Sequence, residues 1–336
     1  MKNLLYIGNK LSAHGSNKTA IETLGPLLEQ EGFAITYASA KKNKIARLAE
    51  MVWKTIAHSR KTDYLLIDTY STYNFWYALV VSQISRILRI KYIPILHGGN
   101  LPKRLLISPR LCKMIFRHSY FNVAPSNYLL SVFEKAGFKN TVFIPNAIKI
   151  NDYKFKQRKD LRPKLFWVRS FAEIYNPEMA LRVLEAVKQD FPEAVLCMVG
   201  PDKKGWLDKI RLLAEQRKLE VKFTGKLSRK AWTKLSEDYD IFINTTHFDN
   251  TPVSVIEAMA LGLPVVSTNV GGLPFLLENH KTGLLVNDDD AVQMAACIKE
   301  LLHNESLADL MASGARQHVQ DFDSEKVKRK WLEILK

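Results

Sequence analysis

The chain has 336 residues, of which 47% are hydrophobic and 25% charged, and its formal net charge is +15 at pH 7. This composition excludes a disordered or low-complexity protein, and the length favours two domains because single cores stop growing near roughly 250 to 300 residues. The apolar run at 75–81 ends in polar residues far short of the roughly 18 positions that span a bilayer, so we expect no transmembrane helix.

Short β-branched and aromatic runs alternate with segments of helical period, which predicts an α/β fold with parallel sheets. In the first half, strands are expected at 3–7, 34–38, 64–67, 92–96, 121–124 and 142–144. The opening MKNLLYIG is interpreted as a strand and not a signal peptide, which favours a cytoplasmic location. Ser126 and Gly137 fit the start and stop of a helix at 126–136.

Two loops of the first half follow expected strands. Gly8 and the residues up to Asn17, which include His14, Gly15 and Ser16, connect the first strand to a helix. The sequence His97-Gly98-Gly99-Asn100 directly follows the strand at 92–96, whose carboxyl end should face a ligand. The histidine with two adjacent glycines favours a functional role over a structural one.

The second half repeats the same rhythm after a polar, lysine-rich linker at 149–164. Strands are expected at 165–168, 195–199, 221–223, 241–243, 265–267 and 284–286. Three widely spaced cysteines, Cys112, Cys197 and Cys297, suit reduced core thiols better than disulfides or a metal cluster.

The segment 249–272 reads DNTPVSVIEAMALGLPVVSTNVGG. Thr251 and Pro252 predict a helix start, with Thr251 as the N-cap and Pro252 at the first helical position. The N-terminus of this helix would lie at the carboxyl edge of a parallel sheet, where phosphates bind. Glu257 lies inside the helix and could accept hydrogen bonds from the vicinal hydroxyls of a ribose. The glycine pair at 271–272 permits close approach of the backbone to a ligand.

This segment resembles the signature of the retaining GT-B glycosyltransferases of family four. In that signature an acidic residue, seven further residues and a glutamate precede an alanine-rich helix, a G-x-P turn, a strand and a Gly-Gly loop. The matching positions are Asp249, Glu257, AMALGLP at 258–264, VVS at 265–267 and the glycine pair. The resemblance implies two Rossmann-like domains facing across a cleft. They would be an acceptor-side domain at 1–150 and a donor-binding domain at 151–320, with a C-terminal helix at 321–336 that can pack back on the first.

The resemblance also implies individual roles. Glu257 would hold the donor ribose, and Arg169, which follows the strand at 165–168, would hold the diphosphate. Asp249 and His97 would lie near the transferred sugar. No lysine follows Arg169 within 170–180, where the family usually has one. The other implied donor-binding residues are Asn250, Thr251, Pro252, Val253, Gly15, Gly271 and Gly272, and the implied acceptor-side residues are Gly98, Gly99 and Asn100.

The implied reaction moves a hexose-type sugar from a nucleoside-diphosphate sugar to a glycan or lipid-linked acceptor with retention of configuration. Its expected setting is the synthesis of cell-surface polysaccharide or lipopolysaccharide. Catalysis would depend on stabilising the departing diphosphate and on positioning the acceptor. Asp238-Tyr239-Asp240 matches a metal-binding D-x-D but precedes the strand at 241–243, at the wrong edge of a sheet. Neither a metal nor another cofactor is expected.

Two alternative functions remain open. A nucleotide-sugar epimerase can share the architecture, and it would turn over a nucleotide sugar without an acceptor. A nucleic-acid-binding protein would account for the basic first half, although no motif that reads bases is recognisable.

The excess positive charge lies almost entirely in the first half. Residues 1–150 contain 21 Lys and Arg against 7 Asp and Glu, whereas residues 151–336 contain 28 against 27. This asymmetry favours an anionic partner, and we expect peripheral attachment to the anionic inner face of the cell membrane without specific nucleic-acid binding. The residues expected on lipid headgroups are Lys41, Lys42, Lys44, Arg47, Trp53 and Lys54 in one segment, and Lys103, Arg104, Arg110, Lys113, Phe116 and Arg117 in another.

Overall fold

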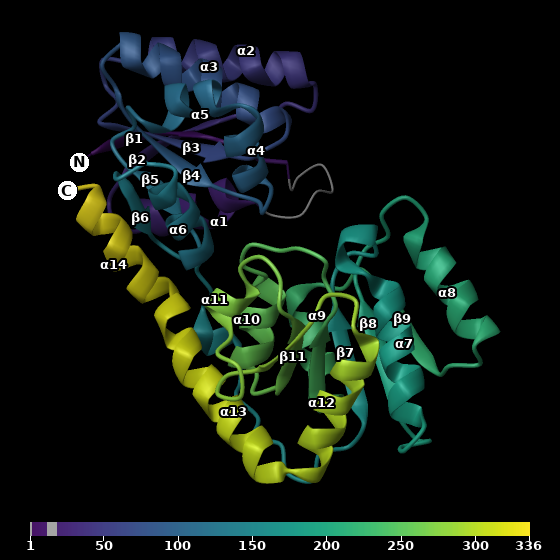
Figure 1. The fold of residues 1–336 in the computed structure, drawn as a ribbon. Helices are drawn as coiled ribbons and strands as arrows, with labels where there is room; N and C mark the ends of the chain where they lie inside the picture. Colours follow the sequence, from purple (N-terminus) through teal and green to yellow (C-terminus); the bar gives the residue numbers. More distant parts are fainter. Residues whose placement is uncertain (1, 12–18) are drawn as a thin grey trace. The chain divides into compact units, whose positions relative to one another are not determined.

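The computed structural model describes residues 2–11 and 19–336, and the chain forms two compact units (Figure 1). Unit 1 comprises Met1–Ala147 and Ser324–Lys336, and unit 2 comprises Ile148–Asp323. The chain thus divides after residues 147 and 323, where the sequence placed boundaries after 150 and 320. At these two crossings Ile148 and Asp323 form a parallel bridge, and the Ile148 amide donates to the Phe322 carbonyl at 2.9 Å.

Unit 1 is built on a six-stranded parallel sheet. Its order is β2-β1-β3-β4-β5-β6, from β1 (Asn3–Ile7), β2 (Ala34–Ala38), β3 (Tyr64–Thr69), β4 (Lys91–Leu96), β5 (Asn122–Ala124) and β6 (Thr141–Phe143). The connections change direction between β1 and β3. In open parallel sheets, ligands bind beyond the carboxyl ends of the strands at such a switch point.

Helices cover both faces of this sheet. One face packs on α2 (Lys44–Ala57), α3 (Tyr73–Ile87), α4 (Leu101–Ile107), α5 (Pro109–Phe116) and α6 (Asn127–Lys135), with Phe75, Phe116 and Phe133 fully buried. The other face packs on α1 (Ala20–Glu29) and α14 (Ser324–Ile334). Trp331 of α14 is only 3% exposed, so a segment that follows all of unit 2 in the chain completes the core of unit 1.

Two residues assigned to a lipid-facing surface are buried instead. The Arg47 guanidinium donates to the carbonyls of Lys41 and Lys42 and to the Asn9 side chain. These hydrogen bonds stabilise the turn before α2. Phe116 lies in the core under α5. The helix at the predicted start Ser126 is confirmed, since the Ser126 hydroxyl accepts a hydrogen bond from the Leu129 amide at 3.1 Å.

Unit 2 has a second six-stranded parallel sheet with a different strand order. The order is β12-β11-β10-β7-β8-β9, from β7 (Lys164–Val168), β8 (Val195–Val199), β9 (Val221–Gly225), β10 (Ile241–Asn244), β11 (Val265–Thr268) and β12 (Leu284–Val286). Counted within the unit and read from the β9 edge this is 3-2-1-4-5-6, the order of dinucleotide-binding sheets. Its switch point lies between β7 and β10.

Apolar clusters lie on both faces of the unit 2 sheet. One contains α7 (Pro177–Lys188), α8 (Trp206–Gln216) and α12 (Ala291–His303), and the other contains α9 (Arg229–Leu235), α10 (Val253–Ala260) and α11 (Leu273–Leu276). Helix α13 (Glu305–His318) contributes to both. Four short 3₁₀ turns complete the unit: η2 (Ile150–Asp152), η3 (Glu173–Tyr175), η4 (Ser236–Asp238) and η5 (Val319–Phe322).

The predicted α/β fold is confirmed, and every strand expected from the sequence is present within a residue or two of its expected bounds. The three cysteines are free, and burial raises the pKa of each thiol. In the described part of the chain, no helix is both long and apolar enough to cross a bilayer.

Candidate functional site

Arg169 lies at the switch point of unit 2, where it is the first residue after β7. Its backbone amide donates to the Val199 carbonyl at 3.0 Å, and its Nε donates to Asn244 Oδ1 at 3.3 Å. The guanidinium carbon lies 5.0 Å from the centroid of the Tyr175 ring, and Nη2 lies 2.8 Å from Asp249 Oδ2. The side chain is therefore held in place at the edge where a parallel sheet binds its ligand.

The ion pair leaves the guanidinium incompletely satisfied. Nη2 is buried and, despite its short distance to Asp249, has no hydrogen bond of acceptable geometry within residues 2–11 and 19–336. The two groups attract each other through charge, which needs only proximity, whereas a hydrogen bond also needs alignment. A planar guanidinium with an unused donor suits the oxygens of a diphosphate.

The loop from β10 to α10 brings Asp249 to the same edge. Asp249 Oδ1 accepts a hydrogen bond from the Asn250 amide at 2.7 Å, and its carbonyl accepts one from the Gly272 amide at 2.9 Å. A Cβ at Gly272 would lie 1.7 Å from the Asn250 carbonyl oxygen, and one at Gly271, whose φ is +54°, would lie 2.2 Å from that of Asp249. The glycine pair thus lets two loops of the site pack backbone to backbone, where the sequence predicted close approach of the backbone to a ligand.

The predicted start of α10 is wrong by one residue. Helix α10 begins at Val253, and Pro252, with ψ of 112°, occupies the N-cap position without a side-chain cap. The Pro252 carbonyl accepts from the Val255 amide at 3.1 Å, which leaves Thr251 outside the helix. The amides of Val253 and Ser254, at the start of the helix, have no carbonyl partner within it and lie close in sequence to Asp249.

Glu257 is buried on α10, and its two polar contacts fall on one oxygen. Oε1 accepts a hydrogen bond from the Tyr153 hydroxyl at 2.5 Å and lies 3.0 Å from Nε of Arg229, whose side chain is 56% exposed. Both the hydrogen bond and the ion pair described for Glu257 therefore involve Oε1. The ribose assignment of Glu257 stays a prediction.

The surroundings of Glu257 act on its ionisation in opposite directions. Burial raises its pKa above the ordinary value, whereas the Tyr153 hydrogen bond and the charges of Arg229 and Arg169 lower it. Burial and the adjacent carboxylate together raise the pKa of Tyr153, so the proton of this pair stays on the tyrosine. Both arginines therefore favour the ionised carboxylate that accepts hydrogen bonds.

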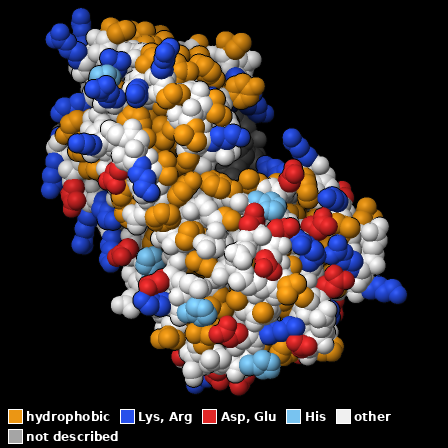
Figure 2. All heavy atoms as spheres, in the orientation of Figure 1, with side chains coloured by type: hydrophobic (Ala, Val, Ile, Leu, Met, Phe, Trp, Pro, Cys, Tyr) orange, Lys and Arg blue, Asp and Glu red, His pale blue; other side chains and the backbone are white. Residues whose placement is uncertain are grey.

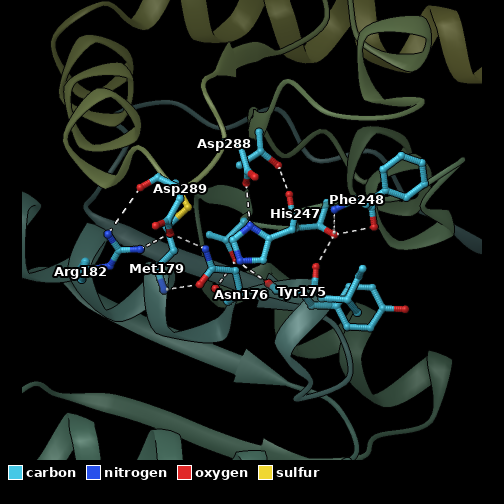
Figure 3. A network of polar contacts seen from close by, with 12 residues as sticks. Tyr175, Asn176, Met179, Arg182, His247, Phe248, Asp288 and Asp289 are labelled. Atoms are coloured by element: carbon cyan, nitrogen blue, oxygen red, sulfur yellow. Dashed lines mark hydrogen bonds and ion pairs between the residues drawn. The ribbon is translucent and has the colours of Figure 1, made fainter. Parts of the chain in front are cut away.

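A second polar network supports the loop that carries Asp249 (Figure 3). His247 Nδ1 lies 2.9 Å from Asp288 Oδ1, and the His247 amide donates to the Ile174 carbonyl. Asp289 contacts both Asn176 and Arg182, and Asp290 caps α12 by accepting from the Gln293 amide. Of the three aspartates at 288–290, Asp290 is therefore the one that caps the following helix.

The predicted unit 1 residues follow β4. His97 is buried, Gly98 has φ of +82°, and Asn100 precedes α4 without forming a side-chain cap. Gly99 lies between Gly98 and Asn100 in the chain. Gly15, with His14 and Ser16, falls outside the described residues.

Three residues with direct contacts in these sites were not singled out from the sequence. They are Asp68, which contacts His97, and Tyr153 and Arg229, which contact Glu257. A charged residue in the apolar strand YLLIDT could have indicated Asp68. Tyr153 and Arg229 carry no local signal, since they meet Glu257 only through the fold.

The D-x-D match has a structural explanation. Asp240 is 4% exposed, and its carboxylate accepts from the backbone and side chain of Arg162 at 3.1 and 2.8 Å. It precedes β10 and so lies at the edge opposite Asp249, as the sequence indicated. Across residues 2–11 and 19–336, no group of three or more His, Cys, Asp or Glu side chains could hold a metal ion.

Comparison with known proteins identifies related sequences. Residues 149–318 match the family described as glycosyl transferases group 1. WcaL of Salmonella typhimurium, assigned to colanic acid biosynthesis as a glycosyltransferase, is 25% identical over 268 residues, which cover 74% of this chain and 65% of WcaL. The sulfoquinovosyl transferase of Arabidopsis thaliana is 28% identical over 151 residues, 44% of this chain and 28% of that protein. The chain thus matches less than two thirds of the length of these curated relatives.

Solved structures share the fold over the whole chain. HepE of Anabaena, in complex with UDP-glucose, has a TM-score of 0.77 and is 19% identical in sequence. The alignment covers 100% of this chain and 99% of HepE. The sucrose-phosphate synthase of Thermosynechococcus elongatus has a TM-score of 0.79 at 16% identity, with 99% of this chain and 98% of that chain aligned. At this identity the likeness establishes the GT-B fold and not the substrate.

Proposed function

The chain belongs to the glycosyl transferases group 1 family, and from this premise we propose that it transfers a hexose-type sugar from a nucleoside-diphosphate sugar to a glycan or lipid-linked acceptor. The proposed reaction retains the anomeric configuration and contributes to a cell-surface polysaccharide or lipopolysaccharide. The colanic acid assignment of WcaL supports this setting.

The observation that carries the proposal is the set of groups at the β7/β10 switch point. Arg169 presents a buried, incompletely bonded guanidinium beside Asp249, and the charge of Arg169 also acts on Glu257. These groups match the parts of a nucleoside diphosphate, with the guanidinium for phosphates and a carboxylate oxygen for ribose hydroxyls. In the proposed roles, Asp249 and the backbone at 250–253 face the transferred sugar and the diphosphate. His97 lies near the transferred sugar, and the loop at 98–100 serves the acceptor side.

Calorimetric titration of UDP, GDP and ADP into the full chain tests the donor site. We expect one nucleotide to bind, with UDP the first candidate because HepE is seen with UDP-glucose. Glu257→Gln should weaken that binding roughly 10- to 100-fold, since it replaces a charged acceptor with a neutral one. The matched control Glu305→Gln makes the same change at an exposed position of α13. If no nucleotide binds to the folded wild type, the proposal fails.

A separate assay, in which the nucleotide sugar is incubated with and without an acceptor, distinguishes transfer from epimerisation. A glycosyltransferase releases the nucleoside diphosphate when acceptor is added, whereas an epimerase converts the nucleotide sugar without acceptor and releases none. Metal independence is also proposed, because Asp240 is engaged by Arg162 at the other edge of the sheet. Chelation of magnesium should then leave the nucleotide affinity unchanged.

A membrane-facing role for unit 1 is proposed from its α2–α5 layer, in which α3 neighbours α2 and α5, and α5 neighbours α4. Lys and Arg side chains outnumber Asp and Glu over unit 1 in Figure 2. Large apolar side chains on these helices are exposed, among them Ile45 at 81%, Trp53 at 63%, Ile87 at 79% and Leu106 at 82%. Basic charge and exposed apolar groups on one layer suit an anionic lipid surface.

Co-sedimentation with vesicles tests this role. The protein should sediment with vesicles that contain anionic lipid and remain in the supernatant with purely zwitterionic ones, and salt should weaken the binding. Binding to DNA but not to anionic vesicles would instead favour the nucleic-acid alternative. Absence of binding to anionic vesicles at low salt would contradict the membrane proposal and leave a soluble acidic glycan as the anionic partner.

A further inference from the structure

A buried carboxylate lies at the switch point of unit 1. Asp68, near the end of β3, is 3% exposed, and Gly8 follows β1 at the adjacent strand end. A Cβ at position 8 would lie 2.5 Å from Asp68 Oδ2, so only glycine leaves room for the carboxylate in this position. The place is where an open parallel sheet of this strand order binds its ligand.

The contacts of Asp68 are unevenly divided between its two oxygens. Oδ1 accepts a hydrogen bond from the Tyr6 hydroxyl at 3.1 Å and lies 2.9 Å from His97 Nε2. Oδ2 is buried and has no hydrogen-bond partner within the described ranges 2–11 and 19–336. A half-satisfied buried carboxylate destabilises a fold, and an apolar side chain would fill the strand at lower cost. Packing alone therefore does not account for an aspartate here.

The imidazole of His97 is fixed from three directions. The His97 amide donates to the Thr69 carbonyl at 2.8 Å, the ring stacks on Tyr70 with centroids 5.0 Å apart, and Nε2 faces Asp68. An ionised carboxylate only accepts hydrogen bonds, so Nε2 carries the proton in this contact. In the neutral ring Nδ1 then bears the lone pair.

We propose that Asp68 is a positioning residue that holds His97 in the Nε2-protonated tautomer, so that Nδ1 accepts a hydrogen bond from a hydroxyl of the sugar substrate. The inference rests on the proposed glycosyltransferase function for the identity of the substrate, but the tautomer itself is a property of the free protein. The Tyr6 hydroxyl donates to the same carboxylate oxygen, Oδ1, at 3.1 Å. Only the loss of Asp68, and not that of Tyr6, should change the histidine.

Nitrogen-15 NMR of the histidine-labelled full chain tests the tautomer directly. The His97 signals are assigned by their loss in His97→Gln. We expect a protonated Nε2 and an unprotonated Nδ1 in the wild type, no change in Tyr6→Phe, and a shift toward protonated Nδ1 in Asp68→Asn. A wild-type ring protonated at Nδ1, or at both nitrogens near neutral pH, overturns the proposal without any need for a variant.

Kinetics separate positioning from a structural role. The probe is hydrolysis of UDP-glucose, or of the glucose donor of whichever nucleotide binds. Asp68→Asn should lower kcat about tenfold, the effect of losing one hydrogen bond, while Tyr6→Phe stays close to the wild type. Nucleotide affinity, which belongs to unit 2, should be unchanged in both. An altered tautomer with unchanged kcat contradicts the proposal, whereas failure of the wild type to bind any nucleotide contradicts the function and leaves the tautomer result standing.

Discussion

Both units have a buried carboxylate that accepts a hydrogen bond from a tyrosine, Asp68 in unit 1 and Glu257 in unit 2, and the two differ in their second partner. Asp68 in unit 1 has a tyrosine hydroxyl and an imidazole on one oxygen, and Glu257 in unit 2 has a tyrosine hydroxyl and a guanidinium on one oxygen. His97 is buried and stacked, whereas Arg229 is more than half exposed.

This difference in partners indicates that the two carboxylates serve different chemical purposes, although both lie in units built on parallel sheets. A fixed imidazole can direct a hydrogen bond to or from a neutral hydroxyl group. An exposed guanidinium keeps its charge and can change partner when an anionic ligand arrives. Under the proposed function, unit 1 would orient a neutral group and unit 2 would recognise an anionic nucleotide.

The largest expected effect concerns the stability of unit 1. Trp331→Ala removes a buried side chain of α14 and should lower the free energy of unfolding by about 3–5 kcal/mol. The exposed control Arg329→Ala should change it by less than about 0.5 kcal/mol. Urea unfolding followed together with nucleotide binding checks this, and a parallel loss of binding would show that the two units do not behave independently.

Nucleotide affinity should depend on residues at the sheet edge of unit 2 and not on those at the sheet edge of unit 1. Arg169→Gln should weaken UDP roughly 10- to 100-fold because a charge-assisted contact to phosphate is lost, while binding of uridine should change little. His97→Gln in unit 1 should leave both affinities unchanged. Equal losses for UDP and uridine would place Arg169 away from the diphosphate.

Removal of Arg229 should make nucleotide binding more sensitive to acid. Burial raises the pKa of Glu257 and Arg229 lowers it, so Arg229→Ala raises that pKa further. Because the ionised carboxylate accepts the ribose hydroxyls, affinity falls as pH drops through this pKa, and in the variant the fall should begin at higher pH. Calorimetry across the acid range, with the exposed neighbour Lys230→Ala as control, measures the shift. If the loss of affinity at low pH began at the same pH in the variant as in the wild type, Arg229 would not act on Glu257.

The smallest effect is expected at the lipid surface. Leu106→Glu replaces an apolar side chain 82% exposed on α4 and should reduce binding to anionic vesicles several-fold. Leu310→Glu makes the same change in unit 2, at a side chain 64% exposed on α13, and should have the weaker effect, limited to its added charge. Equal losses would show that overall charge and not the α2–α5 layer controls binding.

Sequence reasoning located the fold and part of the sites. The strands were predictable because each is a short apolar run bounded by turn residues. The resemblance singled out Arg169 and Asp249, which the fold brings within 2.8 Å of each other, and their roles stay predictions. The start of α10 was misplaced because Thr-Pro suits a helix N-terminus in two registers, and only the extended ψ of Pro252 decides between them.

Pairings across long sequence distances could not be predicted. Tyr153 lies 104 residues from Glu257, and Asp68 lies 29 residues from His97. Arg47 and Phe116 were assigned to a basic and aromatic surface because composition does not say which side of a helix faces the core. Arg47 turns inward because free carbonyls of the preceding turn accept its hydrogens.

The two adjacent chain crossings at Ile148 and Asp323 also bear on synthesis by the ribosome. Unit 2 is one uninterrupted stretch, so it can fold as soon as it has been translated. Unit 1 cannot complete its folding at that stage, because α14, which carries the core residue Trp331, follows all of unit 2 in the chain. During translation the earlier part of unit 1 must therefore wait with one face of its sheet incompletely covered, and a chaperone that shields apolar surface would meet this half of the nascent chain first.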